Sequence, residues 1–229
     1  MTALIDKYRP AHWGEVRFQD KAIIVLGRIA AEGRFDQRAY WLVGPTGVGK
    51  TTIARLIAGE VSDEWGTREM DAADLTPAEI AQAEEDSWYT SIGKGGHAFI
   101  INEADRLSAA ARGKLKTVLE RIRPGTVWIF TTTRRRGVQR DLFGGNTSEA
   151  GQLMDRCLVI SLDSLYADRA PEIAPWLREI AQAEGLDGKS VADYERLWAE
   201  ICSDPGDPKA ECPGSLRAAL GAIEGGAML

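Results

Sequence analysis

A stretch in the first quarter of the chain has the residue types and spacing that bind a phosphate chain. Residues 44–51, GPTGVGKT, satisfy the pattern G-x-x-x-x-G-K-[ST]. Glycines let backbone amides turn toward the phosphates, Lys50 adds a positive charge, and the Thr51 hydroxyl suits Mg²⁺. A Gly-rich turn can arise by chance, but here an apolar strand precedes it and a helical pattern follows, as the motif requires. The residues expected to bind nucleotide are Gly44, Pro45, Thr46, Gly47, Val48, Gly49, Lys50, Thr51 and Thr52.

A second polar group follows an apolar run at residues 99–105, FIINEAD. In a P-loop ATPase the first of these polar residues holds the water shell of magnesium, and the Glu after it polarises the attacking water. Here the pair is Asn102 and Glu103. An amide oxygen accepts from a metal-bound water but carries no charge, so we expect weaker magnesium binding, which an aspartate at position 102 would restore. The plainer alternative is that Asn102 only ends a buried strand.

The elements that must position these residues alternate along the chain. Strand-like apolar runs lie at 39–43, 97–101, 126–131 and 157–162, with a weaker one near 68–71. Helical patterns lie between them at 50–61 and 113–122, and the second has an apolar stripe of Leu115, Val118, Leu119 and Ile122. Strands that alternate with helices predict an α/β fold with a parallel sheet covered on both faces.

The pattern changes after residue 162. Helical periodicity appears at 171–185, 190–202 and 215–224, residues 204–214 read as a loop, and no further strand is evident. We therefore expect an α/β nucleotide-binding domain at 1–162 and a small all-helical domain at 163–229.

Composition excludes several classes of protein. The 229 residues are 27% charged and 44% hydrophobic, as in soluble globular proteins. No apolar run is long enough to span a membrane, and the N-terminus lacks a secretory signal pattern. Three cysteines without a CxxC pair indicate a reduced, cytoplasmic compartment. The net charge of −6 argues against a globally basic nucleic-acid binder but allows local basic patches.

Several motifs occur in the order found in one family. They are KYRPAHWGEV at 7–16, the phosphate loop, INEADRLS at 101–108, FTTT at 130–133, DRC at 155–157 and GSLRAAL at 214–220. Over almost the whole chain the sequence resembles AAA+ ATPases of the clamp-loader type, such as replication factor C small subunits and phage clamp-loader large subunits. The resemblance implies an AAA+ P-loop fold with a five-stranded parallel sheet, followed by a helical lid.

The resemblance also implies an activity. The chain would use ATP and Mg²⁺ to open a sliding clamp and load it onto primer–template DNA, hydrolysing ATP between subunits of a hetero- or homo-oligomeric ring or spiral. It would work without a membrane, in the cytoplasm, that of a bacterial host if the chain is phage-encoded. The alternatives are another AAA+ DNA remodeller, such as a helicase loader or branch-migration motor, and a nucleotide-bound scaffold in which Asn102 has ended hydrolysis.

Individual roles follow from the motifs that match. Tyr8, Arg9 and Pro10 match the segment around the adenine. Thr133 matches the sensor of the γ-phosphate, Arg156 the finger that reaches a neighbouring subunit's ATP, and Arg217 the second sensor on the lid. Together with Glu103 and Lys50, the last three are the expected catalytic residues, and Thr51 and Asn102 are the expected metal-side residues. Guanidinium suits both arginine roles because it stays charged and offers a fork of donors.

The chain departs from the family in four respects. Asn102 replaces an aspartate, and Asp155 replaces the Ser before the finger, where it is expected to hold Arg156 back without phosphate. A longer segment, 134–154, separates Thr133 from the finger and reads as a flexible surface loop. The sequence lacks the collar domain that usually follows the lid, so assembly would rely on other interfaces or a partner, unless the chain is truncated.

Two regions are candidates for partner surfaces. Residues 86–96, DSWYTSIGKGG, place Trp88 and Tyr89 side by side as anchors for a sliding clamp. The alternative is that at least one of them is a core residue, because adjacent residues do not share a helix face. A basic set could face the DNA backbone or be a solvated surface. This set comprises Arg112, Lys114, Lys116, Arg134, Arg135, Arg136 and Arg140.

Overall fold

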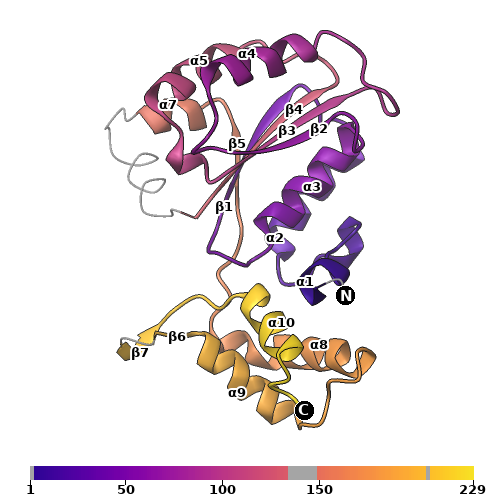
Figure 1. Ribbon diagram of the computed structural model, residues 1–229, viewed down its shortest axis with the longest axis vertical. Coiled ribbons are helices and arrows are strands. Elements are labelled where there is room, and N and C mark those ends of the chain that lie inside the picture. The colour runs from indigo at the N-terminus through magenta and orange to yellow at the C-terminus, as the bar shows by residue number, and fades with distance from the viewer. Residues whose placement is uncertain (1–2, 134–148, 205–206) are drawn as a thin grey trace. The chain divides into compact units, whose positions relative to one another are not determined.

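The structure, a computed structural model, describes residues 3–133, 149–204 and 207–229, although side chains are not described at 149–151 and 204–211. The chain divides into two compact units (Figure 1). One, here called the α/β unit, comprises residues 12–44 and 50–162. The other, the helical unit, comprises residues 163–229 together with 1–11 and 45–49. Among the described helices, none is long and apolar enough to cross a membrane.

The α/β unit is built on the five-stranded parallel sheet that the sequence predicts. The strand order is β2-β3-β4-β1-β5. The strands are β1 (Arg38–Val43), β2 (Thr67–Asp71), β3 (His97–Asn102), β4 (Thr126–Thr132) and β5 (Leu158–Ser161). The three central strands are almost wholly buried, because helices cover both faces of a parallel sheet, and this explains their continuous apolar sequences.

Helices cover both faces of this sheet (Figure 1). They are α2 (Asp20–Ala31), α3 (Lys50–Val61), α4 (Pro77–Asp86), α5 (Ala109–Leu119) and α7 (Glu149–Met154), with short 3₁₀ turns at Trp13–Glu15 and Ala104–Arg106. Helices α4, α5 and α7 share one apolar core with Trp41, Phe99, Trp128 and Phe130 of the strands. Helix α3 lies across the sheet from these three helices (Figure 1).

The aromatic core fixes the strands in register. The rings of Trp41 and Phe130 stack with centroids 5.1 Å apart, and those of Phe99 and Trp128 lie 4.5 Å apart. Because all five strands run the same way, their C-terminal ends meet at one edge of the sheet. Ligands bind at this edge in open parallel sheets. The phosphate loop after β1 and the residues after β3 and β4 all begin there.

The helical unit contains α1 (Leu4–Lys7), a 3₁₀ turn (Ala167–Arg169), α8 (Ala170–Ala183), α9 (Val191–Ile201) and α10 (Leu216–Glu224). The apolar face of α8 is buried at Ile173, Leu177, Ile180 and Ala181. Ser190 caps α9 in a capping box with Asp193.

One feature of the helical unit corrects the sequence analysis, which expected no strand after residue 162. A short antiparallel hairpin joins β6 (Ser203–Asp204) to β7 (Asp207–Glu211). Few β-branched or aromatic residues mark this segment, so the usual strand signal is absent. The pairing depends on backbone hydrogen bonds, which sequence periodicity does not report.

Candidate functional site

The phosphate loop joins β1 to α3 in a conformation that glycine allows. Gly47 has φ of 77° and Gly49 has φ of 103°, both in the left-handed region. The Lys50 ammonium donates a hydrogen bond to the Gly44 carbonyl at 2.9 Å, so it lies against the first residue of the loop. Thr51 and Thr52 are half-buried in the first turn of α3, where the helix dipole favours an anion. The loop therefore fits a phosphate chain.

Gly47 is needed for close packing as well as for its backbone angle. A Cβ at this position would lie 1.9 Å from Ser215 Oγ and 3.1 Å from Ser215 Cα. Both residues belong to the helical unit. Ser215 caps α10, accepting a hydrogen bond from the Ala218 amide at 3.3 Å. The glycine thus lets the loop approach the first turn of the helix that carries Arg217, an exposed residue.

Alanine at position 47 is expected to destabilise the chain. Left-handed strain and overpacking together lower the free energy of unfolding by about 2–4 kcal/mol. Gly49→Ala meets no atom within 4 Å and adds only the strain, about 1 kcal/mol. Gly59→Ala, inside α3 and with open space, is expected to be neutral or stabilising. Chemical denaturation measures all three, and equal losses for Gly47→Ala and Gly49→Ala would contradict the close approach to Ser215.

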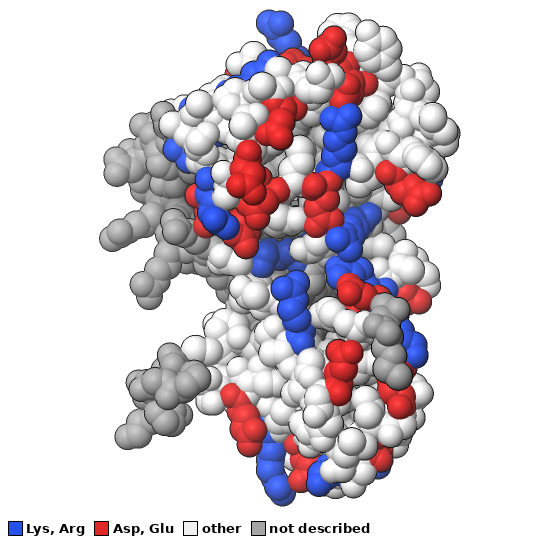
Figure 2. Space-filling view, in the orientation of Figure 1, with Lys and Arg blue, Asp and Glu red and all other residues white. Residues whose placement is uncertain are grey.

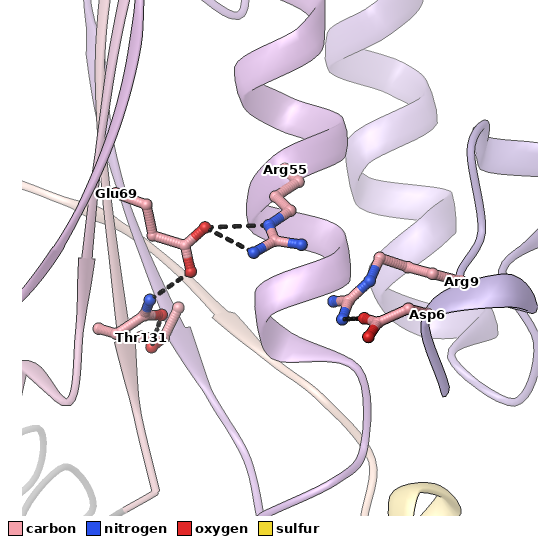
Figure 3. Close-up of polar contacts among 6 residues, drawn as sticks. Asp6, Arg9, Arg55, Glu69 and Thr131 are labelled. Atoms are coloured by element: carbon pink, nitrogen blue, oxygen red, sulfur yellow. Dashed lines mark hydrogen bonds and ion pairs between the residues drawn. The ribbon is translucent and has the colours of Figure 1, made fainter. Parts of the chain in front are cut away.

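Asn102 ends β3 with both of its polar side-chain atoms engaged. Its Nδ2 donates to Glu69 Oε1 at 2.7 Å, and its Oδ1 accepts from the Thr131 hydroxyl at 3.0 Å (Figure 3). Arg55 of α3 donates to the other Glu69 oxygen through two nitrogens, each at 2.9 Å. The side chain is therefore part of a polar network across three strands and a helix. The oxygens of Thr51 and Asn102 are metal-ligand atoms of the kind that Mg²⁺ prefers.

Glu103 follows β3 in a backbone conformation rare for a residue with a side chain. Its φ is 54°, and its carboxylate accepts from Arg106 Nη1 at 2.8 Å. The side chain is 55% exposed, so it lies open to solvent at the edge where the phosphate loop begins. Thr133 is also exposed, directly after β4, whereas the neighbouring Thr132 is buried and donates to Asp105 at 2.9 Å.

Arg156 is held by its own chain. Its Nη2 lies 2.6 Å from Glu120 Oε1, its Nε donates to the same oxygen at 3.2 Å, and its Nη1 donates to the Gln152 carbonyl at 2.6 Å. The sequence analysis expected Asp155 to restrain this arginine; the ion pair is instead with Glu120. The guanidinium lines a groove of about 350 Å³ with Arg38 and Leu158, among others. Burial raises the pKa of the adjacent Cys157 thiol to about 12, so it is not a nucleophile at neutral pH.

The N-terminal arm is fastened within the helical unit. The Tyr8 hydroxyl donates to Glu184 Oε1 at 2.5 Å, and Lys7 Nζ donates to the same oxygen at 2.6 Å. These hydrogen bonds lower the pKa of Glu184, and the one from Tyr8 raises the pKa of Tyr8. Arg9 pairs with Asp6 at 2.6 Å (Figure 3), and Pro10 is half-buried. These contacts fix the position of the arm within the helical unit.

Neither Trp88 nor Tyr89 belongs to the core. The exposed fractions are 63% for Trp88, 70% for Tyr89, 76% for Ile92 and 70% for Trp65. We call these four residues the aromatic surface. Asp63 links its two segments, because its carboxylate accepts from the backbone amides of Trp65 and Lys94. These hydrogen bonds lower the pKa of Asp63, and the one from the Lys94 amide contributes most to the lowering. The alternative that at least one of the two aromatics is a core residue was therefore wrong.

The basic residues of α5 already have partners in the chain. Lys114 pairs with Glu84 at 2.7 Å, Lys116 donates to Gln152 at 2.7 Å, and Arg112 donates to the Leu107 carbonyl. Basic and acidic side chains are interspersed over the α/β unit, at the top of Figure 2. The remaining members of the predicted basic set, Arg134–Arg136 and Arg140, lie outside the described residues, as does most of the segment 134–154.

Sheet order, the position of the loop and the polar strand ends together define an AAA+ P-loop fold. The family described as "ATPase family associated with various cellular activities (AAA)" matches residues 40–149. The Thermotoga maritima RuvB Holliday junction branch migration motor has the same fold, with a TM-score of 0.63 and 22% identity over 95% of this chain and 64% of that one.

Relatives of the chain include subunits of replication factor C. The large subunit from Methanosarcina mazei is 29% identical over 188 residues, which are 79% of this chain and 28% of the relative. Small subunit 1 from Pyrobaculum arsenaticum is 26% identical over 192 residues, 80% of this chain and 52% of the relative. The chain thus carries an AAA domain and is homologous to replication factor C subunits over most of its length. It spans about half or less of the length of these relatives.

Four residues of this site were not found by sequence reasoning: Arg55, Glu69, Thr131 and Thr132. Glu69 lies in the weakest strand, and its contact with Asn102 depends on how β2 pairs with β3. Nothing in the sequence alone specifies that register. The roles of the predicted site residues stay predictions, although the geometry gives each a defined place.

Proposed function

We propose that this chain is an ATP-hydrolysing clamp-loader subunit that acts on a sliding clamp at primer–template DNA. The observation that carries the proposal is the pairing of a phosphate loop, with Lys50 against its first residue, and Glu103 exposed at the same edge of the sheet. The homology to replication factor C subunits supports the substrate class.

The predicted phosphate-binding, metal-side and catalytic residues each have a role in this proposal. The loop amides and Lys50 bind the phosphates of ATP, and Thr51 and the oxygen of Asn102 face the metal. Bound Mg²⁺ supplies positive charge to the phosphate oxygens. Glu103 accepts a proton from the attacking water, and the Thr133 hydroxyl reads the γ-phosphate.

The arginines and the N-terminal arm complete the proposed site. Arg156 leaves Glu120 and acts on the ATP of a neighbouring subunit, where it stabilises charge in the transition state. Arg217 acts on the nucleotide of its own subunit, and Tyr8, Arg9 and Pro10 bind the adenine. The proposed domains are residues 1–162 for nucleotide binding and 163–229 for the lid.

The aromatic surface is the proposed docking site for the sliding clamp. Exposed Trp and Tyr side chains make strong anchors at protein interfaces. Arg123 stacks 3.6 Å over the Trp88 ring and limits its freedom, so less entropy is lost on docking. DNA contact is assigned to the basic segment that follows Thr133, and assembly to further copies or related subunits in the cytoplasm.

Turnover measurements separate this proposal from its alternatives. We expect slow ATP hydrolysis by the chain alone and stimulated hydrolysis when a sliding clamp and primed DNA are added together. Clamp alone and primed DNA alone are the controls. Stimulation by four-way junction DNA without a clamp would instead favour the branch-migration motor that the RuvB fold suggests. ATP binding without turnover under every condition would indicate the scaffold.

A further inference from the structure

A network of four hydrogen-bonded polar side chains crosses the α/β unit. It runs from Arg55 on α3 to Glu69 on β2, then to Asn102 on β3 and Thr131 on β4 (Figure 3). The three successive donor–acceptor distances are 2.9, 2.7 and 3.0 Å. The four residues come from four different elements, so this polar network depends on the fold rather than on local sequence.

Strand register brings Glu69 to Asn102. Strands β2 and β3 are parallel, with Glu69 opposite Ile100 and Asp71 opposite Asn102. Side chains two residues apart on a strand point to the same face, so Glu69 and Asn102 share a face and meet diagonally. Arg55 reaches Glu69 from α3 and lies one helical turn after Thr51, on the same side of that helix.

The chemistry of Glu69 fixes which way the Asn102 amide points. An ionised carboxylate only accepts hydrogen bonds, so the amide nitrogen of Asn102 must face Glu69. The amide oxygen therefore faces β4, where it accepts from Thr131. Strand β4 pairs with β1, and Gly44 at the start of the phosphate loop donates its amide to the Thr132 carbonyl at 3.3 Å. The oxygen is thus turned toward the strand that adjoins the loop.

We propose that Glu69 is a positioning residue for the metal side of the site: held by Arg55, it keeps the oxygen of Asn102 turned toward β4, the strand that adjoins the phosphate loop. This inference rests on the proposed function, because it assigns to Asn102 a part in Mg²⁺-dependent nucleotide binding. A free asparagine could turn either its oxygen or its nitrogen to the metal's water shell. Glu69 removes that ambiguity without adding a second charge at position 102.

The same geometry predicts what Glu69→Gln does. Arg55 only donates hydrogen bonds, so it takes the oxygen of the new side-chain amide and leaves the nitrogen of that amide facing Asn102. Asn102 must then turn its own oxygen toward position 69 and its nitrogen toward Thr131. The variant keeps every hydrogen bond but reverses the Asn102 amide. Mutation of the outer partners of metal ligands typically lowers metal affinity by about 10- to 100-fold.

The effect of Asn102→Asp also depends on residue 69. Alone, Asn102→Asp sets two carboxylates at the present 2.7 Å contact, where the donor of the hydrogen bond is lost and like charges repel. When Asn102→Asp is combined with Glu69→Gln, the amide nitrogen at position 69 donates to the new carboxylate, and Thr131 donates to its other oxygen. The expectation from sequence, that an aspartate at position 102 raises magnesium affinity, therefore holds only when Glu69 is changed as well.

The test uses the full chain as wild type, the two single variants and the double variant. A fluorescent ADP analogue is titrated with and without Mg²⁺, and thermal unfolding is followed without nucleotide. We expect Glu69→Gln to reduce the Mg²⁺-dependent gain in affinity by about tenfold, with Mg²⁺-free affinity unchanged. Asn102→Asp should lower the unfolding midpoint at neutral pH, and the double variant should restore it and bind Mg²⁺–nucleotide at least as tightly as wild type.

Glu84→Gln is the matched control. Glu84 has 33% side-chain exposure against 31% for Glu69, and it too pairs with a basic residue, Lys114. An Mg²⁺-dependent gain in Glu69→Gln equal to that of wild type would overturn the proposal, and so would an equal loss with and without Mg²⁺. A wild-type chain that bound no nucleotide would overturn the proposed function and this role together. The unfolding midpoints would still show whether residues 69 and 102 are coupled.

Discussion

Replacing Lys50 with alanine is expected to weaken ATP binding by about 100-fold and to reduce turnover below detection. The ammonium lies 2.9 Å from the Gly44 carbonyl, so it is positioned at the loop. A hydrogen bond between charged groups contributes more to binding than one between neutral groups. The motif offers the phosphates no lysine other than Lys50. Fluorescent nucleotide titration and a phosphate-release assay measure the two effects.

Lys94→Ala provides the control for this prediction. The Lys94 ammonium also donates to a glycine carbonyl, that of Gly59, so the two lysines make the same kind of contact. We expect Lys94→Ala to leave nucleotide affinity unchanged, whereas its unfolding curve reports any general loss of structure. Equal affinity losses in both variants would mean that Lys50 stabilises the loop rather than binding phosphate.

Glu103→Gln is expected to bind ATP like the wild type and to lower turnover by about 100- to 10,000-fold, because the amide cannot take a proton from water. Glu103→Gly should lose turnover equally while gaining up to about 1 kcal/mol of stability, since glycine relieves the left-handed backbone. In Glu103→Gly, turnover is therefore expected to fall while stability rises. Single-turnover hydrolysis and chemical denaturation measure them.

Gln37→Gly is the matched control for the backbone effect. Gln37 has φ of 56°, nearly the same as Glu103, and lies directly before β1, at the opposite end of the strands. This variant should gain stability and keep the turnover of the chain alone. Wild-type turnover in Glu103→Gln would exclude Glu103 as the base.

Much of the α/β unit was predictable because its signals are local and strong. The buried strands β1, β3 and β4 are continuous apolar runs, and α3 begins where the phosphate motif predicts. Helix α5 starts at Ala109, earlier than its apolar stripe suggested, because Ser108 caps it. Helix α4 was not predicted, although its Thr76–Glu79 capping box and Pro77 are readable signals. Its mostly small and acidic residues gave little periodicity.

The site was predictable only where one motif carries it. Residues 44–52 and Glu103 follow from a pattern with a known mechanism, so their types and spacing are informative. The partners Glu69 and Glu120 were not, because the contacts with Asn102 and Arg156 join segments 33 and 36 residues apart. Sequence periodicity describes one element at a time, whereas these contacts depend on strand register and on packing between elements.

The hydrogen bond between Asn102 and Glu69 also constrains how this sequence can change over evolutionary time. A chain in which Asn102→Asp arises first passes through a state with two opposed carboxylates. A chain in which Glu69→Gln arises first reverses the Asn102 amide but places no two like charges in contact. The two orders of substitution therefore reach the same pair through different intermediates, one with opposed carboxylates and one with a reversed Asn102 amide and weaker Mg²⁺ binding.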